Sequence, residues 1–185
     1  LFGGSGYCVE WGAEQYVRDA RIAMIYEGTN GIQAMDLVGR KLTRNQGAYV
    51  KRLVERVRAD LGDGDDIEPP LRPFREAAVG EMARLERVSA ALIDAAGKDP
   101  AAAGAAAHDY LHLLGHALYA WMWFKAARAA HRGLSGNGPA GKEFYQAKLI
   151  VGRHFLERQL PRSESLERQI AAGPEGLMAL DRFLF

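Results

Sequence analysis

The chain contains a single cysteine, Cys8, and no apolar run long enough to cross a membrane. One cysteine cannot form an intramolecular disulfide, and its isolation agrees with a reducing compartment. Lysine and arginine number 24 against 23 aspartate and glutamate residues, a net charge of +1. This balance gives no basic surface for nucleic acid and no excess charge for a membrane surface. With no secretory signal either, we expect a cytoplasmic protein without nucleic-acid partner or membrane span.

Strand signals are also missing. The 185 residues are 48% hydrophobic and 25% charged, which is an ordinary globular composition, and most glycine clusters and the seven prolines fall between apolar-periodic segments. No run alternates like strands at regular turn spacing, so we predict an all-α helical bundle with up-down antiparallel helices. A glycine-rich loop at 1–9 and an apolar tail at 176–185, expected to dock on the bundle or a partner, flank the helices. The helices are expected at 10–24, 30–43, 48–61, 71–96, 101–132, 141–160 and 163–171.

An acidic, proline-ended stretch at 62–70 is the best candidate for a linker between domains 1–61 and 71–185. Its aspartates Asp63, Asp65 and Asp66 raise the possibility of calcium. The twelve-position calcium loop with its closing glutamate is absent, so the linker interpretation is preferred.

Three histidines, His108, His112 and His116, fall at i, i+4 and i+8 of a predicted helix and share that side with Tyr119 and Trp123. Metal binding is one interpretation of such a row. The pattern lacks a further carboxylate beyond Asp109, so we predict no metal site. A helix packed on both sides, or one that faces another subunit, explains the row better.

Glu27 occupies a glycine-flanked turn between two amphipathic segments, within the stretch 25–33. Gly28 and Gly31 can take backbone angles that other residues avoid, and Thr29 and Asn30 are good helix N-caps. The N–H groups of a helix opening attract phosphate or a developing oxyanion. A carboxylate base and a phosphate site are therefore expected within a few residues, although a lone glutamate is more often a solvated side chain.

Three segments in order, at 3–7 (GGSGY), 18–22 (RDARI) and 25–29 (IYEGT), resemble successive motifs of the acyl-CoA dehydrogenase family. The resemblance covers roughly residues 1–42 closely, and three motifs in register are far more specific than one glycine-rich run. The helical remainder is similar to the extra C-terminal domain of larger members, including enzymes for long-chain acyl-CoA and methylthio-propionyl-CoA.

The resemblance implies a site. Glu27 matches the general base, which removes the α-proton of an acyl-CoA thioester while the β-hydrogen leaves as hydride to flavin N5, giving a trans-2-enoyl-CoA. The Glu27 amide and a flavin ribityl hydroxyl would polarise the thioester oxygen. Tyr26 and Gly28 match the substrate contacts. The positions expected at FAD are Gly4, against the flavin of a neighbouring subunit, and Thr29, Asn30 and Gly31.

The resemblance also implies partners: FAD in the complete enzyme, electron-transfer flavoprotein as acceptor, and a homodimer or homotetramer that serves fatty-acid β-oxidation. The family's usual glutamine before the Leu1–Gly4 stretch is not in this chain, nor are the N-terminal helical and β domains that enclose flavin and thioester. We therefore expect a C-terminal fragment that is inactive alone. Two alternatives remain: a helical interaction and oligomerisation module without activity, and an acyl-CoA oxidase. Acyl-chain specificity is not readable because the pocket walls are absent.

Overall fold

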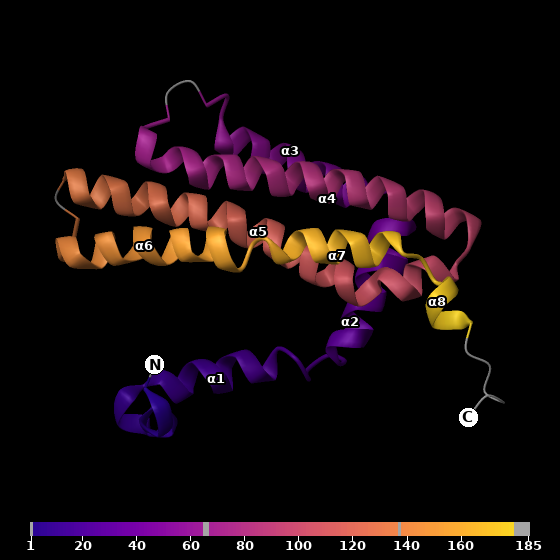
Figure 1. Ribbon diagram of the computed structural model, residues 1–185, viewed down its shortest axis with the longest axis horizontal. Helices are drawn as coiled ribbons and strands as arrows, with labels where there is room; N and C mark the ends of the chain where they lie inside the picture. Colours follow the sequence, from indigo (N-terminus) through magenta and orange to yellow (C-terminus); the bar gives the residue numbers. More distant parts are fainter. Residues whose placement is uncertain (1, 65–66, 137, 180–185) are drawn as a thin grey trace.

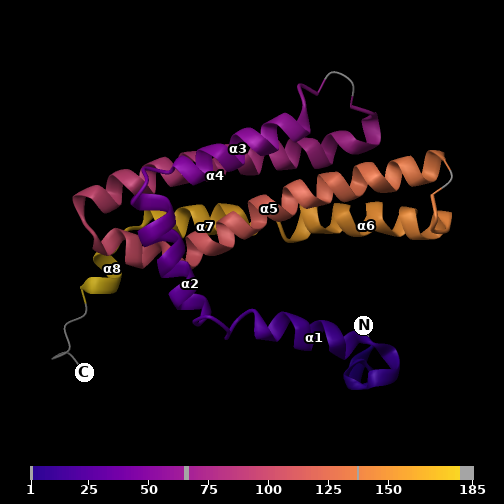
Figure 2. The same ribbon diagram turned by 180° about the vertical axis from the view of Figure 1, so that it is seen from behind.

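The computed structural model describes residues 2–64, 67–136 and 138–179, and in these ranges every regular element is helical, which confirms the all-α prediction. No helix within them is long and apolar enough to cross a membrane. Figures 1 and 2 show a helical bundle from which an N-terminal arm projects, joined to it by α2.

The arm consists of two 3-10 turns and one helix: η1 (Gly3–Tyr7), η2 (Val9–Trp11) and α1 (Ala13–Ile22). The glycine-rich segment is thus wound into short turns where the sequence predicted an open loop. Gly12, at φ 66°, takes the left-handed conformation that separates η2 from α1. No residue between 2 and 33 is buried. The arm accordingly lies apart from the bundle in both views (Figures 1 and 2).

The arm enters the bundle through α2 (Asn30–Asp36), which continues into η3 (Leu37–Thr43), a turn with wider π-helical winding. Ala34, Val38 and Leu42 recur every four residues and are at most 1% exposed. Their shared face packs on α5. This contact is what holds the C-terminal side of the Glu27 turn.

The bundle itself is built from long helices that run back and forth (Figure 1). Apolar residues at three- and four-residue steps predicted each of them to within a few residues at the ends. Pro161 separates α6 from α7, which lie end to end along α5. The elements are α3 (Ala48–Leu61), η4 (Pro69–Leu71), α4 (Arg72–Lys98), α5 (Ala101–Ser135), α6 (Lys142–Arg158), α7 (Arg162–Ala171) and the short α8 (Glu175–Met178).

Helix α5 is the centre of the core. One stripe of it is 0% exposed, made by Tyr110, Leu113, Ala117, Ala120 and Phe124. Each large apolar side chain buried in this way contributes about 1.5–3 kcal/mol relative to exposure. Helices α2, α4, α6 and α7 all contact α5.

The same core crosses the predicted linker, because buried residues of α3 and of α4 both belong to it. Arg75 Nε donates to the Leu61 carbonyl over 3.1 Å, and Trp121 Nε1 donates to Asp60 Oδ2 over 2.7 Å. These bonds fix the C-terminal end of α3 against α4 and α5. The domain boundary at 62–70 stays a prediction, and Asp65 and Asp66 lie outside the described residues.

Candidate functional site

The turn that carries Glu27 has an unusual backbone. Glu27 has φ 54° and Gly28 has φ 105°, so two successive residues lie in the left-handed half of conformational space. A non-glycine residue is uncommon there and is disfavoured by contacts of its Cβ. At Gly28 a Cβ would also stand 3.0 Å from Ile32 Cγ2. The turn therefore requires glycine at position 28, and a further interaction must hold Glu27 in its left-handed conformation.

Helix α2 starts directly after this turn. Thr29 occupies the N-cap with extended backbone, φ −72° and ψ 167°, although its side chain makes no capping hydrogen bond. The Gln33 N–H donates to the Thr29 carbonyl over 3.0 Å, and Gln33 Nε2 donates back to the Glu27 carbonyl over 2.7 Å. Gln33, the last residue of the stretch 25–33, is not among the site residues predicted from the sequence. Its signal in the sequence is a long amide side chain one turn into a helix that follows a glycine turn.

The structure groups most of the predicted site residues and separates one. Tyr26, Glu27, Gly28 and Thr29 lie on the short connection between α1 and α2, while Asn30 and Gly31 open α2; Tyr26 is 54% exposed. Gly4 lies in η1, at the opposite end of the arm from α2 (Figure 1). The structure therefore does not bring Gly4 to Glu27 within one chain.

The first turn of α2 presents backbone N–H groups that have no acceptor within the helix. A Cβ added at Gly31 would meet only Thr29 Oγ1, at 3.9 Å, so the surface around it is open. Donors of this kind fit the phosphates of a dinucleotide. Glu27 beside them is exposed. The connection thus combines a carboxylate that can accept a proton with N–H donors for an anionic ligand.

The histidine row on α5 has a different surrounding. The rings of His108 and His112 meet edge to face with centroids 4.6 Å apart, while His116 Nδ1 lies 3.1 Å from Ser163 Oγ on α7. Burial lowers the pKa of His116, and the charges of His112 and Arg162 lower it further. In the ranges that the structure describes, no group of three or more His, Cys, Asp or Glu side chains is arranged to hold a metal ion.

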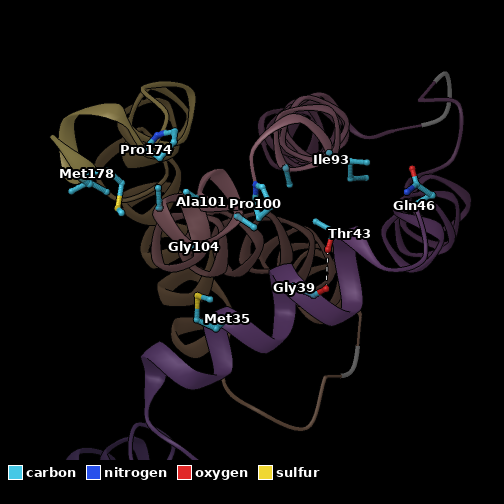
Figure 3. A pocket seen from close by; sticks show the side chains of 15 residues that line it. Met35, Gly39, Thr43, Gln46, Ile93, Pro100, Ala101, Gly104, Pro174 and Met178 are labelled. Atoms are coloured by element: carbon cyan, nitrogen blue, oxygen red, sulfur yellow. Dashed lines mark hydrogen bonds between the residues drawn. The ribbon is translucent and has the colours of Figure 1, made fainter.

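An apolar groove lies away from the Glu27 turn. This groove of about 900 Å³ opens where η3, the α4–α5 turn and α8 meet (Figure 3). Met35, Ile93 and Met178 line it together with glycines, alanines and prolines, and the Thr43 hydroxyl on its wall donates to the Gly39 carbonyl. None of the lining side chains titrates near neutral pH. The groove therefore offers no acid–base chemistry, and Glu27 is not part of it.

Two family models match this chain. The model described as "Acetyl-CoA dehydrogenase C-terminal like" matches residues 50–181, and the model "Acyl-CoA dehydrogenase, C-terminal domain" matches residues 1–43. The second match includes the whole arm, the Glu27 turn and α2, while the first covers most of the bundle.

Curated relatives agree with the models. The 3-methylmercaptopropionyl-CoA dehydrogenase of Ruegeria pomeroyi is 36% identical over 86% of this chain and 27% of its own length. The broad-specificity linear acyl-CoA dehydrogenase FadE5 of Mycobacterium tuberculosis is 28% identical over 99% of this chain and 31% of its own length. The mitochondrial short-chain specific acyl-CoA dehydrogenase of Rattus norvegicus is 52% identical over 42 residues, which are 23% of this chain and 10% of that protein.

The chain therefore spans between a quarter and a third of the two relatives that it matches over most of its length. Motifs, fold and matches coincide, and the chain belongs to the acyl-CoA dehydrogenase family, of which it carries the C-terminal helical part.

Proposed function

We propose that the protein containing this chain is an FAD-dependent acyl-CoA dehydrogenase in which Glu27 is the general base. The observation that supports this most directly is the position of Glu27: a carboxylate on a left-handed turn, immediately before the free N–H groups of α2. The family matches reach this segment, and the relatives' names describe acyl-CoA dehydrogenases. The class of substrate that we propose is an acyl-CoA thioester.

In this proposal the Glu27 carboxylate takes the α-proton of the thioester. Its own backbone N–H is the donor toward the thioester oxygen, where negative charge develops as the proton leaves. When bound, FAD would supply the acceptor for the β-hydrogen, which leaves with its electron pair, so that the substrate loses H⁺ and H⁻ and gains a carbon–carbon double bond. Tyr26 and Gly28 line the acyl-CoA side of the turn. Thr29, Asn30 and Gly31 bind the dinucleotide through the opening of α2.

The exposure of the turn sets a requirement. A carboxylate base works on a carbon acid only where water is excluded, yet no residue from 2 to 33 is buried in this chain. We propose that the remaining domains of the complete protein cover Glu27, and that the arm carries Gly4 to the FAD of a second subunit in a homodimer or homotetramer. The electrons then pass to electron-transfer flavoprotein. The isolated chain is expected to be inactive.

The test uses the complete protein and its Glu27→Gln variant, which keeps the side-chain shape and removes the base. Acyl-CoA should bleach the yellow flavin of the wild type, whereas the variant should bind flavin and bleach at least about a hundredfold more slowly. Glu55→Gln, an exposed glutamate of α3, is the matched control. Bleaching that survives Glu27→Gln would remove Glu27 as base. Oxygen consumption without another acceptor would identify an oxidase.

A further inference from the structure

The Glu27 turn has a single side-chain brace among the described residues. Gln33 Nε2 donates a 2.7 Å hydrogen bond to the carbonyl oxygen of Glu27, six residues back along the chain. This carbonyl belongs to the residue with φ 54°, and the next residue, Gly28, has φ 105°. The amide of Gln33 therefore acts on the strained part of the turn.

Gln33 itself is held in place by α2 and by the core. The Gln33 backbone N–H is bonded to the Thr29 carbonyl over 3.0 Å, in the first turn of α2. The neighbouring Ala34 is 1% exposed, and its face of α2 packs on α5. Gln33 is thus tied to the bundle through the residue that follows it, while its side chain reaches out to a turn that has no buried residue of its own. Gln33 therefore connects the buried face of α2 to the carbonyl of Glu27.

We propose that Gln33 is a positioning residue for proton abstraction: it holds the Glu27–Gly28 peptide in the left-handed conformation that aims the carboxylate and the Glu27 N–H at the thioester. The proposal rests on the proposed function, since it assumes that Glu27 is the base. A left-handed glutamate is disfavoured relative to a right-handed one, and one hydrogen bond offsets a cost of this kind. Without the bond, the turn relaxes toward conformations in which the base points elsewhere.

The alternative is that Gln33 only stabilises the start of α2, as many polar side chains do near helix ends. The two roles differ in what they change. A stabilising residue affects how much flavin-loaded enzyme is present, but not the rate of each loaded molecule. A positioning residue lowers the rate per bound flavin and leaves the binding of acyl-CoA unchanged.

The experiment compares Gln33→Met, which keeps the length of the side chain and removes the donor, with Gln33→Glu, whose carboxylate only accepts hydrogen bonds. Both are made in the complete protein, with the exposed Gln146→Met of α6 as control. We expect kcat per bound flavin to fall about fivefold to tenfold in both variants, with KM changed less than about twofold. Hydrogen exchange of the peptide spanning residues 22–33 should become faster in both, and remain as in the wild type in Gln146→Met.

A double variant separates the two proposals. If Gln33 acts through Glu27, Gln33→Met causes a smaller loss of rate in the Glu27→Gln background, where only the backbone N–H remains to be positioned, than in the wild type. An unchanged kcat per flavin in Gln33→Met, or an equal loss in both backgrounds, would overturn the positioning role and leave Glu27 as base untouched. Full activity of Glu27→Gln alone would instead overturn the proposed function.

Discussion

Ser89 and Tyr110 form a polar pair inside the apolar core, between α4 and α5. The Ser89 hydroxyl donates to the Leu85 carbonyl of its own helix, and the Tyr110 hydroxyl lies 2.7 Å from Ser89 Oγ. Because the single proton of Ser89 goes to Leu85, Tyr110 is the donor in the second bond. Burial raises the pKa of Tyr110 to about 12, even though the bond to Ser89 acts in the opposite direction.

The buried Tyr110 hydroxyl predicts a loss of folding stability at alkaline pH. An unfolded tyrosine ionises near pH 10, whereas Tyr110 in the folded chain keeps its proton to about pH 12. Stability should therefore fall as pH rises through this window, by roughly 3 kcal/mol for this group. Tyr110→Phe should not show this loss of stability at alkaline pH. At neutral pH it should be about 1 kcal/mol less stable than the wild type, because the hydrogen bond to Ser89 is missing. Urea unfolding of both proteins between pH 8 and 12 measures the free energy of unfolding. If this energy falls equally with pH in both proteins, Tyr110 is not the source of the loss.

Two helical glycines predict opposite effects of the same substitution. A Cβ at Gly152 would stand 2.6 Å from Phe74 Cε1 and 2.9 Å from Trp123 Cε3, and Phe74 is fixed in the core with 1% exposure. Gly152→Ala should therefore destabilise the bundle by about 1–3 kcal/mol through overpacking. Gly80, exposed on α4, has nothing within 4 Å of a Cβ. Gly80→Ala should stabilise by about 1 kcal/mol through helix propensity alone.

Thermal unfolding of the two variants beside the wild type is sufficient as a measurement. A Gly152→Ala protein as stable as the wild type would mean that α6 can move away from α4 and α5 without loss of packing.

At the scale of elements, α7 is attached in an unusual way. Its one buried side chain is that of a serine, Ser163, which contacts His116 of α5. Partly buried Leu166 and Ile170 pack against the core. Charged groups add links to α4: Arg84 pairs with Glu81 on its own helix and with Glu167 over 2.9 Å, and Arg87 reaches Glu167 over 2.7 Å. The arginines lower the pKa of Glu167, against the opposing effect of burial. Polar contacts thus determine much of how α7 docks.

Glu81 makes this attachment pH-dependent. The residue is 4% exposed, its Oε2 atom has no hydrogen-bond partner among the described residues, and burial raises its pKa despite Ser163 and Arg84 nearby. The folded state therefore holds this proton to a higher pH than the unfolded state, whose glutamate titrates near 4.5. Its contribution to stability is complete below that value and is lost as pH rises through the raised pKa.

Glu81→Gln removes this titration, so we expect the variant to gain stability relative to the wild type as pH rises above 4.5. The attraction of Arg84 is already part of this titration, because it opposes the rise in the pKa of Glu81. Unfolding in urea at several pH values gives the slope. The exposed Glu76→Gln of the same helix is the control and should follow the wild type. Equal slopes in both variants would rule out Glu81 as the source.

The sequence predicted some elements well for a physical reason. The apolar stripe of α4, with Phe74, Met82 and Leu85, recurs at helical spacing and is buried as expected, because periodicity reports directly which face meets a core. Periodicity is silent on polar packing: Glu81 lies between two buried apolar positions and gave no signal of burial. It also gave no sign of the π-helical winding of η3, which α2 acquires where it packs on α5.

In the candidate site, too, the sequence predicted some features and not others. Local motifs predicted Glu27, Thr29 and Gly31 for the site; Glu27 and Thr29 lie on the connection between α1 and α2, and Gly31 lies in the first turn of α2. The left-handed backbone of Glu27 and the bond from Gln33 were not readable, because both depend on the exact course of the turn. In α6, Tyr145 is buried, while the apolar Phe144 and Val151 are each 51% exposed, so apolar residues of this helix do not all face the core. Of the predicted tail at 176–185, Leu177 is 69% exposed and Met178 is 71% exposed, and residues 180–185 lie outside the described ranges.

At the scale of the whole molecule, arm and bundle differ in what supports them. The bundle has one continuous core that extends from Ala34 to Leu160. The arm has large apolar side chains in water: Tyr7 is 89% exposed, Tyr16 is 79% exposed and Trp11 is 59% exposed. Exposure of this extent is a sign of a covered surface in a larger assembly. The two relatives that match most of this chain are three to four times as long as the matched segment.

This difference predicts where the isolated chain is cut by trypsin. Arg18 and Arg21 are exposed on α1, a helix whose contacts are with η1 and η2. Because an isolated helix of this length is marginal in water, cleavage after these arginines should precede cleavage within the bundle. The trimmed product should retain the helical signal and thermal midpoint of the bundle, since no core residue is removed. In the complete protein the same two sites should be protected. A midpoint that falls when the arm is removed would show that the arm packs on the bundle after all.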